Sequence, residues 1–273
     1  IKRQLFFFLI FFPLICFGDE MKKLQKKAAD CFVKKDYLCA EVAIQKSIQI
    51  DSTIHDLYIN LGIVKKLLGK NDEALVALNK SLELSPNDLM ALNSKASLLI
   101  DMSDYQSALY TLNKALQISS FNENAMVNRA IVYWKLKNFE SSVSDFNDVL
   151  KVNPKNYIAR VNLAILKMEQ GEYEEALRNF NVVLEQYPGN AKILTYIAEA
   201  EMNLKSFENA MVRVNQSIKA DPNYIRAYMI RGNIELELDK KELAEKDFQH
   251  VLEVGTEDEK KWAKKILGSC IKD

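Results

Sequence analysis

The stretch from Tyr157 to Asn190 carries two runs of apolar residues at helical spacing, separated by a short polar turn. Apolar residues that recur every three or four positions form one face of an amphipathic α-helix. Gly171 opens the turn, and Pro188 ends the second run because proline cannot continue a helix. The stretch therefore predicts a helical hairpin. Its apolar positions are Ile158, Val161, Ala164, Ile165 and Met168, then Tyr173, Ala176, Leu177, Phe180, Val183 and Leu184.

This pattern recurs every 34 residues, seven times, without an insertion or deletion. The repeats begin at Met21, His55, Leu89, Glu123, Tyr157, Ala191 and Ile225. When each repeat is numbered from 1 to 34, positions 8 and 20 are small and position 24 is large and apolar. Small residues opposite a large one allow the two helices of a repeat to cross closely. Position 24 is Ile44, Leu78, Leu112, Phe146, Phe180, Val214 and Phe248.

Position 17 is aromatic in five of the seven repeats, and position 32 is proline in four of the seven, at Pro86, Pro154, Pro188 and Pro222. This set of positions resembles the tetratricopeptide repeat, and the resemblance covers residues 21–258. It implies an all-α fold, an α-α superhelix or solenoid of antiparallel helix pairs. Position 4 departs from the pattern, because the family favours an aromatic there and this chain has Arg160 in the fifth repeat.

The two ends of the chain differ from the repeats. Each repeat of a solenoid exposes apolar surface that only a neighbour covers, so the ends of the stack need caps. Residues 259–273 are predicted to form a C-terminal capping helix, whose amphipathic pattern starts at Glu257. The seven repeats then occupy residues 19–258, and residues 1–18 form a separate N-terminal segment.

Residues 1–18 have the features of a signal peptide: Lys2 and Arg3 precede an uncharged apolar run that extends to Phe17. We expect cleavage after Gly18. An alternative is lipidation of Cys16 and membrane association, although Ile15 stands where lipoprotein signals have a small residue. A retained anchor is a third alternative. Each of them predicts an exported protein of the periplasm or cell envelope.

Charge and chemistry narrow the function. The chain has 37 basic and 37 acidic side chains, so it lacks the excess of positive charge that nucleic-acid binding requires. His55 and His250 lie in different repeats without a nucleophile or metal-ligand spacing around them, and no glycine-rich loop suits a phosphate. We therefore expect no enzymatic activity, no cofactor, no metal and no small-molecule substrate.

Two cysteines, Cys31 and Cys39, fall at positions 11 and 19 of the first repeat. The turn between them folds the two helices back together, so a disulfide is geometrically possible, and an exported location would permit it. The alternative is that Cys31 packs inside the repeat as a small apolar residue.

The resemblance implies that the first helices of the repeats line a concave groove that binds peptide segments. Asn60, Asn128 and Asn162 at position 6 offer a donor and an acceptor to a peptide backbone. The groove would otherwise be apolar, and exposed apolar surface of that extent marks a binding site. Alternatively, some of these residues pack against neighbouring helices. The apolar candidates are Ile59, Ile63, Val127, Ile131, Trp134, Ile158, Val161 and Ile165.

These observations predict a non-catalytic scaffold that binds a protein or peptide segment in the groove, as an adaptor in a bacterial cell-envelope assembly. Two alternatives are a self-assembling structural protein and an accessory subunit of an enzyme complex. The sequence leaves the oligomeric state open. A second asparagine column, at position 25, is expected to form hydrogen bonds between repeats or along its own helix. Its members are Asn79, Asn113, Asn147, Asn181 and Asn215.

Overall fold

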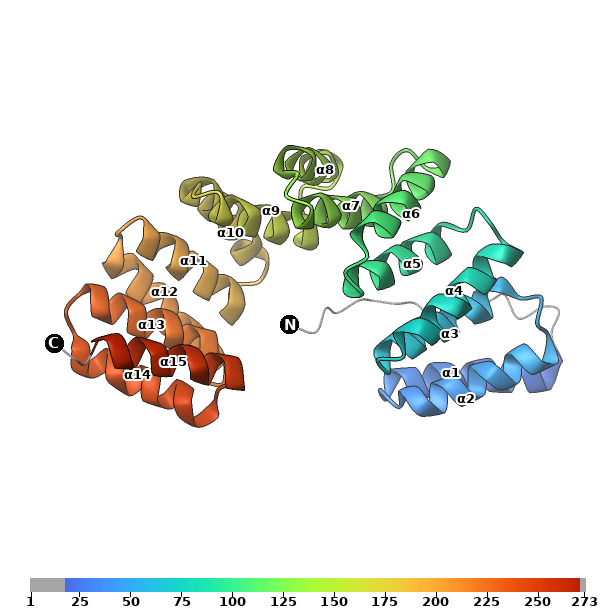
Figure 1. The fold of residues 1–273 in the computed structure, drawn as a ribbon, viewed down its shortest axis with the longest axis horizontal. Helices are drawn as coiled ribbons and strands as arrows, with labels where there is room; N and C mark the ends of the chain where they lie inside the picture. Colours follow the sequence, from blue (N-terminus) through green and yellow to red (C-terminus); the bar gives the residue numbers. More distant parts are fainter. Residues whose placement is uncertain (1–17, 271–273) are drawn as a thin grey trace. The chain divides into compact units, whose positions relative to one another are not determined.

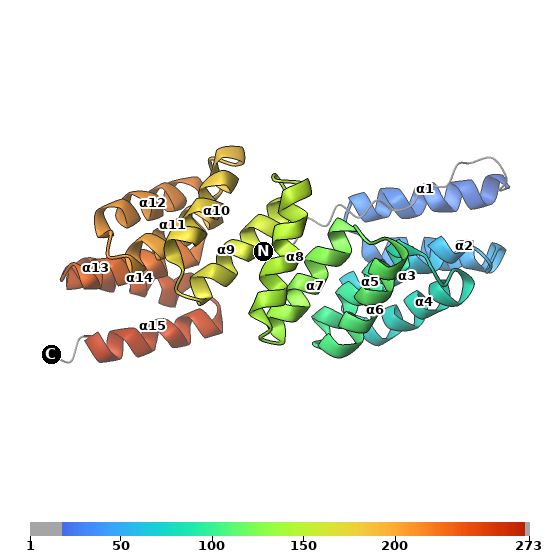
Figure 2. The same cartoon turned by 90° about the horizontal axis from the view of Figure 1, so that it is seen from above.

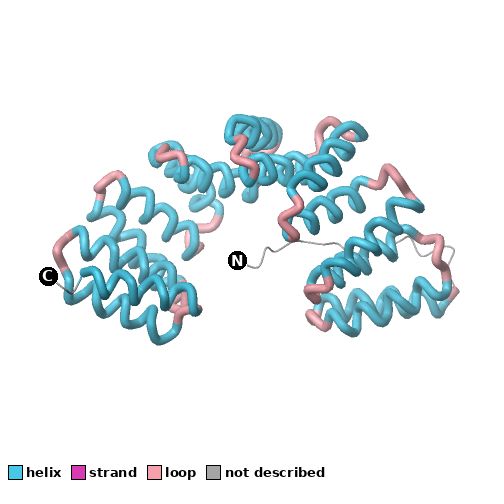
Figure 3. The backbone as a smooth tube through the Cα atoms, in the orientation of Figure 1, coloured by secondary structure: helices cyan, strands magenta, loops and turns pink. Residues whose placement is uncertain are grey.

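The computed structural model describes residues 18–270, which fold into α-helices without a β-strand (Figure 3). Residues 1–17 of the predicted signal peptide, including Cys16, lie outside the described residues. Among residues 18–270, no helix is both long and apolar enough to span a membrane. Figure 1 labels the helices: α1 (Asp19–Val33), α2 (Tyr37–Ile50), α3 (His55–Leu67), α4 (Asn71–Leu84), α5 (Leu89–Asp101), α6 (Tyr105–Ile118), α7 (Glu123–Lys135), α8 (Phe139–Val152), α9 (Tyr157–Glu169), α10 (Tyr173–Gln186), α11 (Ala191–Asn203), α12 (Phe207–Ala220), α13 (Ile225–Glu237), α14 (Lys241–Val254) and α15 (Glu257–Cys270).

The chain divides into two compact bodies. The N-terminal body extends to Asp145 and the C-terminal body begins at Phe146, so the boundary falls inside α8. In the N-terminal body, α1 packs on α2, α3 on α4 and α5 on α6. In the C-terminal body, α9 packs on α10, α11 on α12 and α13 on α14. Figure 2 shows one such pair, α1 and α2, running side by side.

Helix boundaries follow the predicted 34-residue register. From α3 to α13, the first helix of each repeat begins at position 1. In all the repeats, the second helix begins at position 17 and ends at position 30. The exception is α1, which begins at Asp19, before the first repeat. Position 32 is serine in the repeat that contains α6, yet α6 ends at the same place as the helices that precede a proline. Proline therefore is not required to stop the second helix.

The turn between the two helices of a repeat uses a left-handed residue at position 15 in every repeat. This residue is glycine in two repeats, at Gly69 and Gly171, and in the other five repeats a non-glycine residue adopts a positive φ. This conformation is unfavourable for a residue with a Cβ atom, so the packing of the paired helices must enforce it. The non-glycine residues are Lys35, Ser103, Lys137, Lys205 and Asp239.

The small positions and the large position of each repeat meet in the core, as predicted. Every residue at position 24 is at most 2% exposed. A Cβ atom added to Gly62, at position 8, would lie 2.6 Å from Cγ of Leu78, at position 24. Ser142, which replaces alanine at position 20, is buried and donates a hydrogen bond of 2.8 Å to the carbonyl of Ala130. Its hydroxyl is thus satisfied inside an apolar crossing.

Three junctions between successive repeats are linked by a hydrogen bond from the side chain at position 4. The hydroxyl of Tyr58 donates to the carbonyl of Ser52 over 3.2 Å, and that of Tyr228 to the carbonyl of Pro222 over 3.1 Å. Both carbonyls belong to position 32 of the preceding repeat. Nε of Arg160 donates to the equivalent carbonyl, that of Pro154, over 3.0 Å. The arginine that departs from the family pattern therefore makes the same link as the aromatic residues.

A second link uses arginine at position 7. Arg129 donates from Nε and Nη2 to the carboxylate of Asp145, with both distances 2.8 Å, and from Nη1 to Oδ1 of Asn113 over 3.0 Å. Asp145 belongs to the same repeat as the arginine, whereas Asn113 is the position-25 asparagine of the repeat before it. The asparagine column thus serves the junction between repeats at this point, and the C-terminal body contains the same link around Arg231.

The last helix, α15, packs against α14. The ring of Trp262 meets the ring of Phe248 edge-on, with centroids 5.5 Å apart. Ala263 is fully buried, and Ile266 and Leu267 are partly buried against the same cluster. This amphipathic helix covers apolar surface of α14 in the way that the end of a repeat stack requires.

Candidate functional site

The candidate site residues lie on the first helices of the repeats, and the structure buries several of them. In α3, Ile59 is 0% and Ile63 is 3% exposed. Both pack in one cluster with Leu78, Ala91 and Leu98. The alternative that these residues pack against neighbouring helices therefore applies to both isoleucines. They stabilise the repeat and offer no surface to a partner.

Asn60, on the same helix, is also buried, at 6% exposure. Its Oδ1 atom is buried and has no hydrogen-bond donor among residues 18–270. A buried acceptor without a donor costs free energy. Because this amide is covered, Asn60 is not placed to contact a peptide backbone in this arrangement.

In α7, the side chains of Val127 and Ile131 are buried, at 6% and 5% exposure. Asn128 is only half-buried, and its amide has no hydrogen-bond partner within residues 18–270. Trp134 is half-buried too, and Nζ of Lys135 lies 5.5 Å from the centre of its ring. The accessible candidates on this helix are therefore Asn128 and Trp134, whereas its aliphatic candidates are buried.

In α9, Ile158 is 42% exposed, whereas Val161 is buried at 6% exposure. Asn162 is half-buried, and its Nδ2 atom donates to the carbonyl of Ile158 over 2.8 Å. This bond within the helix leaves Oδ1 of Asn162 as an available acceptor. Ile165 is half-buried against the cluster that contains Phe180. Three accessible candidates therefore lie on α9: Ile158, Asn162 and Ile165.

The C-terminal body adds a charged aromatic cluster that sequence reasoning missed. Tyr196 on α11 stacks on Phe180, and the cations of Lys192 and Arg226 lie 5.4 Å and 5.2 Å from its ring centre. Arg226 also pairs with Glu199 over 2.7 Å. Apart from Phe180, these residues occupy positions 2, 6 and 9 of the sixth repeat and position 2 of the seventh. Comparing those positions between successive repeats is the signal that would have found the cluster.

Lys192 has no carboxylate partner among residues 18–270, in contrast to Arg226. Burial lowers the pKa of Lys192, and the nearby charge of Arg226 lowers it further. Burial raises the pKa of Tyr224, which immediately precedes α13, to about 12. Within residues 18–270, Glu199 is the carboxylate that pairs with this cluster, through Arg226, and the charge of Lys192 has no ion-pair partner there.

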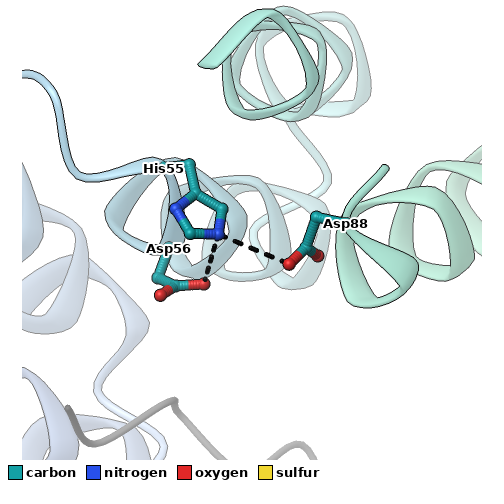
Figure 4. A group of neighbouring side chains, drawn as sticks. All are labelled: His55, Asp56 and Asp88. Atoms are coloured by element: carbon teal, nitrogen blue, oxygen red, sulfur yellow. Dashed lines mark ion pairs between the residues drawn. The ribbon is translucent and has the colours of Figure 1, made fainter. Parts of the chain in front are cut away.

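In the N-terminal body, the structure brings together His55, Asp56 and Asp88 (Figure 4). His55 and Asp56 open α3, and Asp88 caps α5 by accepting a hydrogen bond of 2.7 Å from the backbone N–H of Ala91. Nε2 of His55 lies 3.4 Å from a carboxylate oxygen of each aspartate. Sequence reasoning missed this group because His55 and Asp88 are one residue less than a full repeat apart. Tyr157 and Asn190 meet in the same way in the C-terminal body.

Burial raises the pKa of Asp56, and the charge of Asp88 raises it further against the opposing effect of His55. The other histidine, His250, has a different setting. Its ring lies against Tyr228, with centroids 4.3 Å apart. His55 therefore lies between two carboxylates, whereas His250 lies against an aromatic ring.

Cys31 and Cys39 are joined by a disulfide, with Cα atoms 5.8 Å apart. Lys65 of the second repeat takes the position of Cys31, and its ammonium group pairs with Glu73, which takes the position of Cys39. Lys65 also pairs with Glu41 over 2.9 Å. Positions 11 and 19 therefore face each other in each of these repeats, joined covalently in the first and by charge in the second.

Comparisons with known proteins agree with this architecture. Three family models, each described as tetratricopeptide repeat, match residues 55–88 and 225–254, residues 127–191 and residues 167–234. The crystal structure of a tetratricopeptide repeat protein from Parabacteroides merdae ATCC 43184 is 26% identical, with a TM-score of 0.71 over 92% of this chain and 98% of that one. No match was found among the curated proteins.

Two further solved structures share the fold. The tetratricopeptide repeat protein YrrB, described as having an unusual peptide-binding site, is 22% identical, with a TM-score of 0.52 over 68% of this chain and 95% of that one. PilW, described as a widely conserved type IV pilus biogenesis factor, is 18% identical, with a TM-score of 0.69 over 76% of this chain and 96% of that one. With its paired helices in one 34-residue register, the chain is a solenoid protein that belongs to the tetratricopeptide repeat family.

Proposed function

We propose that this protein is a non-catalytic scaffold that binds a protein or peptide segment on the first-helix faces of its repeats. The observation that carries the proposal is the state of the asparagines at position 6. Asn128 is half-exposed without a hydrogen-bond partner among residues 18–270, and Asn162 has an available acceptor. An amide in this state can pair with the backbone of an extended segment regardless of its side chains.

Apolar contacts support the same proposal on α9. Ile158 and Ile165 lie close to Asn162 in the sequence at helical spacing, and both retain exposed surface. An amide flanked by exposed aliphatic groups suits a segment that alternates backbone hydrogen bonds with apolar side chains. Trp134 offers a comparable contact beside Asn128 on α7. Each body thus presents its own set of contacts.

The charge around Tyr196 adds a preference for acidic segments. Lys192 lacks a carboxylate partner within the described residues, so a carboxylate of the bound segment would compensate its charge. We expect Lys192→Glu to weaken the binding of acidic segments and to leave that of neutral segments unchanged. A loss of both would show that the substitution damages α11 itself.

We place this activity in the cell envelope, as an adaptor of an envelope assembly. The support is the apolar run before Gly18 and, by analogy of fold alone, the pilus biogenesis factor PilW. Fractionation of cells that produce the full chain tests the location. Recovery of the protein in the cytoplasm with residues 1–18 intact would contradict it.

The binding proposal is tested by crosslinking with a photoreactive amino acid placed at Trp134 or at Ile158, followed by mass spectrometry of the captured segment. Asn128→Ala tests the N-terminal body with the photoreactive residue at Trp134, and Asn162→Ala tests the C-terminal body with the photoreactive residue at Ile158. Asn181→Ala is the matched control, because Asn181 is an exposed asparagine on a second helix. Capture should fall in at least one test variant and not in the control. Unchanged capture in every variant would overturn the proposal.

Self-assembly is a second candidate, and one observation favours it. Position 22 carries Val42, Val76 and Tyr110 on α2, α4 and α6, with exposures of 50%, 69% and 76%. Large apolar residues exposed at the same position of three neighbouring repeats suit contact with a second copy of the chain. Sedimentation velocity on the native chain and on Tyr110→Glu tests it. A monomer that is independent of concentration would exclude this role.

A further inference from the structure

The cluster of His55, Asp56 and Asp88 has no role in the binding surface proposed above. His55 and Asp56 are the first two residues of α3, and Asp88 immediately precedes α5. The structure therefore brings together three potential metal ligands, two at the start of the second repeat and one at its last position, immediately before α5 (Figure 4). Each offers one ligand atom, and these atoms lie within 4.8 Å of one another.

The distances do not fit a simple hydrogen-bonded triad. Nε2 of His55 is 3.4 Å from each carboxylate, which exceeds the usual range for an N–H···O hydrogen bond. A single Nε2 atom carries at most one proton and cannot donate it well to two acceptors. However, two ligands held about 2.1 Å from a tetrahedral metal ion are themselves roughly 3.4 Å apart. The two distances from Nε2 of His55 to the carboxylate oxygens of Asp56 and Asp88 therefore already match the ligand–ligand distance around a tetrahedral metal ion.

Burial and charge give a second, independent indication. The side chain of Asp56 is only 8% exposed, and no hydrogen-bond donor within residues 18–270 reaches its carboxylate. A carboxylate so covered normally has a donor or a cation beside it. Asp88 uses Oδ1 to cap α5, which leaves Oδ2 turned toward His55. Two carboxylates thus lie close together, and within residues 18–270 neither of them forms an ion pair with a lysine or an arginine.

We propose that His55, Asp56 and Asp88 form a binding site for a divalent first-row transition metal ion such as Zn²⁺. Nε2 of His55 and one oxygen of each aspartate supply three protein ligands, and water completes the coordination. The imidazole nitrogen favours Zn²⁺, Co²⁺ or Ni²⁺ over Mg²⁺ and Ca²⁺, which prefer oxygen ligands alone. Bound metal joins the start of α3 to the start of α5, and so fixes the junction between the second and third repeats.

The test uses the full chain, produced without a histidine tag and treated with a chelator. Calorimetric titration with Zn²⁺ should give one site per chain, and Ca²⁺ should give no comparable signal. His55→Gln and Asp88→Asn should each weaken Zn²⁺ binding by at least about tenfold. Asparagine still caps a helix, so Asp88→Asn preserves the start of α5. His250→Gln is the matched control and should bind Zn²⁺ as the native chain does.

A spectroscopic readout keeps the proposal testable if a variant misfolds. Co²⁺ added to the native chain should give the intense visible absorption of a four- or five-coordinate ion, and Zn²⁺ should displace it. Three results would overturn the proposal: no uptake of Zn²⁺ by the native chain, uptake unaffected by His55→Gln, or equal loss in His250→Gln. Each would identify the cluster as an ion pair of the protein alone, or the bound metal as adventitious.

Discussion

Arg231 of α13 holds Asp247 of α14 through two parallel hydrogen bonds, each 2.7 Å long, and Nη1 of the same arginine reaches Asn215 of the preceding repeat over 3.0 Å. Arg129, Asp145 and Asn113 repeat this arrangement in the N-terminal body. Arginine suits the role because its planar fork matches a carboxylate and still leaves a donor for a third group. One side chain thus fixes both a helix pair and the junction to the repeat before it.

We expect Asp247→Ala to lower the free energy of unfolding by about 2–4 kcal/mol, because it leaves Arg231 partly buried without its partner. Urea denaturation followed by circular dichroism measures the loss, and hydrogen exchange should locate it in α13 and α14. Lys80→Ala is the control. It breaks the exposed pair with Glu83 and should leave stability unchanged. An equal effect of the two variants would contradict the role of the arginine link.

The left-handed turn residues lead to paired predictions. Ser103 has a φ of 63° and Gly171 a φ of 79°. Ser103→Gly should stabilise the chain by about 0.5–1 kcal/mol, because it relieves strain at the Cβ atom. Gly171→Ala should destabilise it by about 1 kcal/mol, although no atom lies within 4 Å of the added methyl group. The backbone conformation, and not a steric clash with a neighbour, causes this loss.

Thermal unfolding measures both substitutions. Ser144→Gly is the matched control, because Ser144 is exposed within the helix α8 and its backbone is not left-handed. Glycine inside a helix lowers stability, so the control should move in the opposite direction from Ser103→Gly. The same sign for both serine substitutions would refute the assignment of strain to position 15.

Glu235 on α13 gives a prediction about pH. Burial raises the pKa of this carboxyl above its ordinary value of 4.5, and the charge of Asp247 adds to the effect. Its Oε2 atom is buried and lacks a hydrogen-bond donor among residues 18–270. A raised pKa means that the folded chain binds the proton more tightly than the unfolded chain. The protonated carboxyl thus favours folding below about pH 4.5, and this contribution disappears as pH rises through the folded pKa.

Glu235→Gln should therefore raise the free energy of unfolding at pH 7 by on the order of 1 kcal/mol, and the gain should shrink as the pH falls toward 4.5. Denaturation of both chains across this range measures the difference. Glu41→Gln should act in the opposite direction. Burial raises the pKa of Glu41, but hydrogen bonds from Lys70 and Lys65 outweigh it and hold the pKa below its ordinary value. A gain at pH 7 that does not change with pH would contradict the account of Glu235.

Reduction of the disulfide between Cys31 and Cys39 should lower the free energy of unfolding by about 2–3 kcal/mol, the value expected for a short closed loop. The loss should appear as faster hydrogen exchange in α1 and α2. Cys31→Ser with Cys39→Ser provides the control, since a reducing agent should then have no further effect there. Two titratable thiols at these positions in protein kept under oxidising conditions would contradict the bond.

The sequence predicted the 34-residue register because every repeat packs its two helices with the same types of residue at the same positions. Small residues at positions 8 and 20 and a large one at position 24 set the helix crossings, and the register set nearly every helix start. For the position-25 asparagines it predicted hydrogen bonds either between repeats or along their own helix, and Asn113 and Asn215 follow the first alternative. It could not separate exposed from buried residues on the first helices, because both are apolar at helical spacing. Ile59 and Ile158 illustrate this, at 0% and 42% exposure.

Only the tertiary structure decided which residues distant in the sequence meet. Arg160 reaches the carbonyl that tyrosines reach elsewhere, and His55 meets Asp88 because the folded helix pair places the last residue of its repeat beside the first. The periodic pattern of a sequence describes what each repeat shares with the others. The chemistry of this protein depends instead on the positions where single repeats differ, and the contacts of those residues are set by the packing of one helix pair on the next.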